Sequence, residues 1–126
     1  MSIPPDVVAI VDDNVYVLRG LGRILSSYGY SVHTFTSAER YLESAGAGRA
    51  SCVVIDLELR GGMSGLDLGR AISSSGNAIP VIFMTGAPYT GIRKQALDIG
   101  CAAFLEKPFP SELLITAIQR AAASAS

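Results

Sequence analysis

Four short apolar runs in the chain each end just before a polar side chain that can bind a metal ion or a phosphate group. The runs and the side chains that follow are Val7–Val11 before Asp12 and Asp13, Cys52–Ile55 before Asp56, Val81–Met84 before Thr85, and Ala102–Leu105 just before Lys107. Short β-branched runs of this kind are typical of strands buried on both faces of a parallel sheet, whose carboxyl ends share the ligand-binding edge. The sequence therefore predicts that three carboxylates, a hydroxyl and an ammonium group converge on one crevice.

Helix-like segments alternate with these runs. Between residues 14 and 28, leucines recur at helical spacing, and Gly29 follows as a stop signal. The alternation predicts one more strand and four more helices: a strand over Ser31–Phe35, and helices from Ser37 to about Ser44, from Ser64, over Tyr89–Ile99 and from about Ser111. Pro88 and Gly91 make the first turn of the Tyr89–Ile99 helix a poor helix former.

Five strand-helix units with right-handed crossovers predict an α/β fold of the flavodoxin-like, doubly wound type. We expect a five-stranded parallel sheet of order 2-1-3-4-5 with five helices, forming one domain over residues 1–126. This order puts the first and third strands side by side. Asp12, Asp13 and Asp56 then meet at the topological switch point of the sheet.

Composition excludes several function classes. The net charge of −1 gives no general case for binding nucleic acid or an anionic membrane. No apolar stretch approaches the roughly 20 residues of a membrane span, and the N-terminal segment lacks the features of a signal peptide, so we expect a cytoplasmic protein. The two cysteines, Cys52 and Cys101, do not form a CxxC motif, and the chain has only one histidine, His33. These observations favour reduced thiols over a disulfide or a zinc site.

Several carboxylates in one crevice repel each other and raise one another's pKa values unless positive charge lies among them. Lys107 supplies one charge. A divalent cation with oxygen ligands supplies the rest, and Mg²⁺ suits this role because it binds through few carboxylates and keeps positions for water and phosphate oxygens. Asp56, which ends the central strand, is then the candidate to attack a phosphoryl donor and hold the product as an acyl phosphate.

Short motifs follow one another along the chain: IVDDN, VVIDLEL around Asp56, MTG at Thr85, and FLEKPF around Lys107. In order and spacing, over nearly the whole chain from about Val7 to Ala121, they resemble the receiver domain of two-component response regulators. The segments GGMSGLDL and CAAFLEKPF are most similar to the nitrogen-fixation transcriptional regulator type. Receivers of that type usually precede a helix-turn-helix DNA-binding domain, so any output domain would lie beyond residue 126, and DNA would be reached only through it.

The resemblance implies a role for each residue of the crevice. Asp56 would accept a phosphoryl group from a sensor histidine kinase. Asp13 would bind Mg²⁺ directly, Asp12 largely through water, and the backbone carbonyl of Glu58 would complete the ligands from the protein. The reaction would be stoichiometric, with slow self-dephosphorylation and no turnover of an external metabolite, so the chain would be a switch and not an enzyme.

The resemblance also implies how the switch works. Thr85 and Lys107 would bind the phosphoryl oxygens, Phe104 would be the aromatic side chain that rotates, and the peptide bond between Lys107 and Pro108 would be cis. The face made by the fourth helix, the fifth strand and the fifth helix would change on phosphorylation. A phosphorylation-dependent homodimer is the expected result.

The chain departs from the family pattern in the loop after Asp56. Arg60 stands where the family usually has proline, and Gly61 and Gly62 lengthen the loop, so we expect it to be more mobile and more basic. Glu58 adds an acid two residues after Asp56. Its side chain could face the mouth of the site or be a solvated loop residue, and the sequence leaves both open.

Other interpretations of the same residues remain at this point. Singly, Asp13 could be a helix cap, Thr85 a turn hydroxyl and Phe104 ordinary core. A haloacid-dehalogenase-type aspartyl phosphatase would share the Asp56-Leu57-Glu58 opening, but that family places its metal-binding acids after the lysine and needs a longer chain. A flavin mononucleotide carrier would need a phosphate loop where Asp12 and Asp13 repel phosphate. A degenerate receiver that only binds protein would not need the full set of polar residues.

Overall fold

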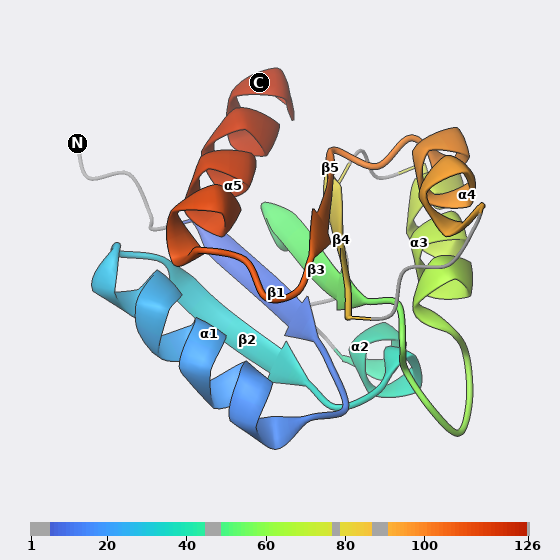
Figure 1. The fold of residues 1–126 in the computed structure, drawn as a ribbon, viewed down its shortest axis with the longest axis horizontal. Helices are drawn as coiled ribbons and strands as arrows, with labels where there is room; N and C mark the ends of the chain where they lie inside the picture. The colour runs from blue at the N-terminus through green and yellow to red at the C-terminus, as the bar shows by residue number, and fades with distance from the viewer. Residues whose placement is uncertain (1–5, 45–48, 77–78, 87–90, 126) are drawn as a thin grey trace.

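The computed structural model describes residues 6–44, 49–76, 79–86 and 91–125, which form a parallel sheet with helices on both faces (Figure 1). The strands are β1 (Val7–Val11), β2 (Ser31–Phe35), β3 (Cys52–Asp56), β4 (Val81–Thr85) and β5 (Ala103–Glu106). The helices are α1 (Val15–Ser27), α2 (Ala38–Glu43), α3 (Gly65–Ser74), α4 (Ile92–Ile99) and α5 (Ser111–Ala125). The strands lie in the order β2-β1-β3-β4-β5, which confirms the predicted fold.

Alternate residues of the central strands point to opposite faces of the sheet and build two apolar layers. On one face, α1 and α5 pack against Val8, Ile10, Val54 and Met84. On the other, α2, α3 and α4 pack against residues that include Val11, Ile55 and Phe83. Figure 1 shows the two groups of helices on either side of the sheet. Burial on both faces explains why the central strands are apolar throughout.

One predicted strand differs from this pattern. The run that ends near Lys107 was expected to be buried on both faces, but Ala103, Phe104 and Leu105 of β5 are only half-buried. The reason is its position, because β5 is an edge strand that pairs with β4 alone. Phe104 therefore lies close to the surface.

The helices start close to the predicted points, for identifiable reasons. The side chain of Asn14 accepts hydrogen bonds from the backbone of Tyr16 and Val17 and so caps α1. Ser64 caps α3 by accepting from Asp67 N. Helix α4 begins only at Ile92, after Gly91 with a φ of 93° and without a side-chain cap. Residues 89 and 90 of the predicted helix lie outside the described residues.

Strand register brings the polar side chains to one edge. Val11 lies opposite Ile55 in the pairing of β1 with β3, so the residues that follow β1 lie beside Asp56. Helix α3 starts directly against the end of β3, since a Cβ atom at Gly65 would lie 2.2 Å from the carbonyl oxygen of Asp56. Only glycine permits this approach.

No helix within the described ranges has the length and apolar character needed to cross a membrane.

Candidate functional site

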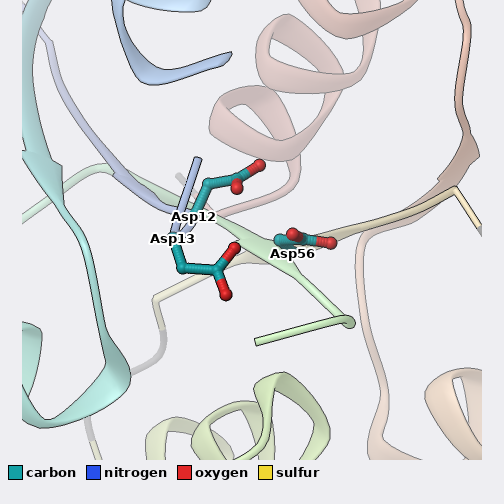
Figure 2. Close-up of side chains that lie close together, drawn as sticks. All are labelled: Asp12, Asp13 and Asp56. Atoms are coloured by element: carbon teal, nitrogen blue, oxygen red, sulfur yellow. The ribbon is translucent and has the colours of Figure 1, made fainter. Parts of the chain in front are cut away.

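Three carboxylates from two neighbouring strands form an acidic cluster (Figure 2). Asp12 and Asp13 follow β1, Asp56 ends β3, and oxygen atoms of the three side chains lie within 4.8 Å of one another. Asp12 is fully buried and Asp56 is 4% exposed, whereas Asp13 is open to solvent. Carboxylate oxygens with one side open to water are a donor set suited to Mg²⁺, which keeps part of its water shell. These residues therefore fit a hard divalent cation.

Backbone amides hold the carboxylates in place. Asn14 N donates to Asp12 Oδ1 at 2.9 Å, and Glu58 N donates to Asp56 Oδ1 at 3.1 Å. Each hydrogen bond closes a short turn in which the aspartate carboxylate accepts a hydrogen bond from the backbone N–H two residues ahead. Aspartate favours this conformation. The turns fix the orientation of the two buried carboxylates before any ligand binds.

Lys107 brings an ammonium group into the cluster from the loop after β5. Its Nζ lies 3.2 Å from Asp12 Oδ2 and 3.5 Å from Asp56 Oδ1. The peptide bond between Lys107 and Pro108 is cis. The residues that the sequence placed at the crevice thus meet there, with one ammonium group beside three carboxylates.

The charge balance of the cluster shows in its pKa values. The pKa of Asp56 is raised to about 6, mainly by burial and also by the nearby carboxylates of Asp12 and Glu58, against the lowering effects of Glu58 N and Lys107. For Lys107, burial lowers the pKa, but the carboxylates around it outweigh burial and raise the pKa above its ordinary value. One ammonium group leaves excess negative charge, which favours binding of a cation.

The side chain of Glu58 faces the site, which resolves the two possibilities left by the sequence. Thr85 Oγ1 donates to Glu58 Oε2 at 2.7 Å, and Gly86 N donates to Glu58 Oε1 at 2.5 Å. Thr85 is fully buried at the end of β4. Glu58 thus links the loop after β3 to the end of β4. Asp56 lies opposite Met84 in the pairing of β3 with β4, so the residues that follow each strand come close to one another.

Phe104 is held from outside by a residue that the sequence did not single out. The guanidinium carbon of Arg93, on α4, lies 5.4 Å from the centre of the Phe104 ring. The ring itself packs partly buried against the apolar layer beneath α2, α3 and α4. Arg93 and Phe104 therefore join α4 to the edge strand.

The loop between β3 and α3, which the sequence predicts to be mobile, is anchored at two points. Arg60 N donates to Asp13 Oδ2 at 3.2 Å. Met63 N donates to Glu39 Oε2 of α2 at 2.7 Å, and this contact lowers the pKa of Glu39. Sequence reasoning missed the role of Glu39, because α2 and the loop are far apart along the chain.

Comparison with known proteins identifies the family. Residues 8–119 match the family model of the response regulator receiver domain. The chain belongs to this family. This family is the receiver domain of the response regulators of two-component systems, which confirms the resemblance seen in the sequence. The comparisons give no support to the phosphatase alternative.

Several relatives of the receiver domain are regulators of bacterial transcription or signalling. The response regulator protein TodT of Pseudomonas putida is 35% identical over 121 residues, which cover 96% of this chain and 53% of TodT. The transcriptional regulatory protein FixJ of Azorhizobium caulinodans is 34% identical over 112 residues, which cover 89% of this chain and 53% of that protein. The receiver therefore spans about half the length of these curated relatives.

Solved structures agree with the fold. The crystal structure of FixJ-N has a TM-score of 0.83 and 33% sequence identity, and the match covers 96% of each chain. A CheY-like receiver domain protein from Methanospirillum hungatei has a TM-score of 0.86 at 23% identity, and so supports the fold alone.

Proposed function

We propose that this receiver accepts a phosphoryl group on Asp56 from a sensor histidine kinase, in the presence of Mg²⁺. The observation that carries the proposal is the position of the Asp56 carboxylate, which lies within metal-sharing distance of Asp12 and Asp13 and 3.5 Å from Lys107 Nζ. Asp12, Asp13, Asp56 and the backbone carbonyl of Glu58 would hold the cation. When bound, it would neutralise charge on the phosphoryl oxygens.

The residues of the chain divide the work of transfer. An oxygen of Asp56 forms the new bond to phosphorus while the bond from phosphorus to the donor histidine nitrogen, or to the oxygen of a small donor, breaks and leaves its electron pair on the donor. Lys107 offers its ammonium group to a phosphoryl oxygen, and Thr85 offers its hydroxyl. Because Asp56 is nearly buried, the acceptor oxygen is shielded on the protein side and open only toward the mouth of the site.

Intact-protein mass spectrometry tests this proposal. With Mg²⁺ and acetyl phosphate, we expect the wild type to gain the mass of one phosphoryl group and Asp56→Asn to gain none. Asp67→Asn is the matched control, since Asp67 is an exposed aspartate that pairs with Arg70 on α3. Labelling that persists in Asp56→Asn would refute Asp56 as the acceptor.

We propose that the chain acts as a switch and does not turn over an external substrate. Each molecule would take up one phosphoryl group and lose it slowly to water. A simple phosphomonoester incubated with the protein and Mg²⁺ separates this function from that of an aspartyl phosphatase. Phosphate release that continues well beyond one equivalent would contradict the switch.

We propose that α4, β5 and α5 form the output face, which we define as the exposed surface of these three elements. Thr85 and Phe104 would couple the site to it. The face carries Leu97 on α4 and Leu113 on α5, each with a relative exposure of 50%, together with the half-buried Phe104 of β5. Exposed apolar side chains of this kind suit contact with another protein surface. A phosphorylation-dependent homodimer is the proposed use.

Hydrogen exchange with and without beryllofluoride tests the output face. We expect the largest changes between Thr85 and Ser111, together with a rise in oligomeric mass. Changes confined to α1 or α2, with no change in mass, would contradict this face.

We further propose that the protein is cytoplasmic and controls transcription through a partner or an output domain outside these 126 residues, which would make any DNA contact.

A further inference from the structure

Glu58 contacts both the acceptor residue and the residues proposed to respond to it. Its backbone N donates to Asp56 Oδ1 at 3.1 Å. Its carboxylate accepts from Thr85 Oγ1 at 2.7 Å through one oxygen and from Gly86 N at 2.5 Å through the other. One residue therefore connects the end of β3 to the end of β4 through three hydrogen bonds.

The contact to Thr85 conflicts with phosphoryl binding. The Thr85 hydroxyl has a single hydrogen, so it cannot donate strongly to Glu58 and to a phosphoryl oxygen at the same time. Gly86 N likewise has one hydrogen to give. A phosphoryl group on Asp56 and the Glu58 carboxylate are also both anionic, and like charges close together in a partly buried site repel each other.

We propose that the Glu58 carboxylate is a latch that keeps Thr85 and Gly86 in the unphosphorylated arrangement, and that a phosphoryl group on Asp56 must displace it. The inference rests on the proposed function, which supplies the competing phosphoryl oxygens. Glu58 is thereby a positioning residue, because it acts on the site through Thr85 and Gly86. Breaking the contacts of Glu58 costs free energy, and the contacts that the phosphoryl group makes must supply it before the switch can change state.

The latch can be tested first without any phosphoryl donor, by nuclear magnetic resonance of the unphosphorylated protein. In the wild type the Gly86 amide proton should resonate well downfield, as expected for a short hydrogen bond to a carboxylate. In Glu58→Ala it should return toward the ordinary range, and the Thr85 signals should move toward their positions in wild type bound to beryllofluoride. Unchanged Gly86 and Thr85 signals would overturn the latch, even where Asp56 is phosphorylated normally.

Titration with beryllofluoride in the presence of Mg²⁺ measures the effect on switching. Wild type must break the hydrogen bonds to the Glu58 carboxylate before it binds beryllofluoride, and hydrogen bonds to charged groups stabilise strongly. Removing them in advance should change the midpoint of the titration by about tenfold. Glu58→Ala should therefore bind beryllofluoride at about one tenth of the wild-type concentration, although it loses some thermal stability. Weaker or equal beryllofluoride binding together with lower stability would show that Glu58 is merely structural.

Two further variants separate the latch from simple charge removal. Glu106→Ala removes an exposed carboxylate that lies opposite Thr85 in the pairing of β4 with β5. Glu58→Gln removes the charge but keeps an oxygen that can accept from Thr85 or Gly86. The latch requires the midpoint to change most in Glu58→Ala, less in Glu58→Gln and little in Glu106→Ala. Equal changes in all three would assign the effect to net charge and overturn the latch.

Discussion

The guanidinium group of Arg93 covers the ring of Phe104, with its carbon 5.4 Å from the ring centre. The contact has the distance of a cation–π interaction, in which the positive group is attracted to the face of the ring. Phe104 belongs to an edge strand and is only half-buried, so Arg93 lies over a ring that the sheet leaves partly open. The contact therefore restrains the residue that is proposed to rotate in the switch.

Replacement of Arg93 by alanine should free the Phe104 ring. We expect Arg93→Ala to lower the free energy of unfolding by up to about 1 kcal/mol and to increase averaging of the ring between orientations. Lys94→Ala is the control, because Lys94 is adjacent on α4 but pairs with the exposed Asp98. Aromatic resonances of Phe104 measure the effect, and identical spectra for the two variants would argue against a restraint by Arg93.

The buried carboxylate of Asp56 should make stability depend on pH. Its pKa is about 6 in the folded protein against 3.8 for an unperturbed aspartate, so the folded state holds the proton more tightly than the unfolded chain. This contribution is fully present below about pH 4 and is lost as the pH rises through about 6. At pH 7 without divalent cations, Asp56→Asn should therefore be more stable than wild type by on the order of 2 kcal/mol.

The pH profile separates this cause from others. Well below pH 4 the wild-type carboxyl group is protonated in both the folded and the unfolded state, so the advantage of Asp56→Asn should disappear. Denaturant unfolding at both pH values, with chelator present, measures the difference. Asp98→Asn serves as the control, since Asp98 is exposed on α4. An advantage of Asp56→Asn that is equal at both pH values would contradict the assignment to burial of the charge.

The fold and the acidic cluster could be predicted because both follow from order along the chain. Apolar runs alternating with helical segments imply parallel strands, and parallel strands bring their ends to one edge. Asp12 and Asp56 thus met in the prediction without knowledge of any side-chain conformation. The half-burial of β5 was missed because burial on both faces depends on a neighbour at each side, and β5 has only β4.

The side-chain contacts around the site could not be predicted in the same way. Glu58 with Thr85, Arg93 with Phe104, and Glu39 with Met63 each join side chains or amides from different elements. Such contacts depend on rotamers and on loop geometry, which periodicity does not encode. Hydrophobic spacing fixes the face on which a residue lies, but it does not fix which polar partner the residue contacts.

Two glycines on helices should respond in opposite ways to a methyl group. At Gly69 on α3 a Cβ would lie 2.3 Å from Cζ of the buried Phe83, whereas at Gly20 on α1 nothing lies within 4 Å. We expect Gly69→Ala to lower the free energy of unfolding by about 1–3 kcal/mol through overpacking. Gly20→Ala should raise it by about 0.5–1 kcal/mol, because alanine loses less entropy in a helix. Urea unfolding decides, and equal effects would contradict the close packing of α3.

Asp13 is the exposed member of the acidic cluster. Its replacement should weaken Mg²⁺ binding while the two buried carboxylates stay in place. Asparagine at this position can still accept the hydrogen bond that Arg60 N makes to Asp13 Oδ2 at 3.2 Å, so Asp13→Asn should keep the loop in place while removing one negative charge. Because Mg²⁺ prefers charged oxygen ligands, we expect its affinity to fall at least about tenfold, or 1.4 kcal/mol. Calorimetric titration with Mg²⁺ measures this, with Asp67→Asn as the matched control for loss of a surface carboxylate. The same affinity in both variants would exclude Asp13 as a ligand and leave the cation to the remaining proposed ligands.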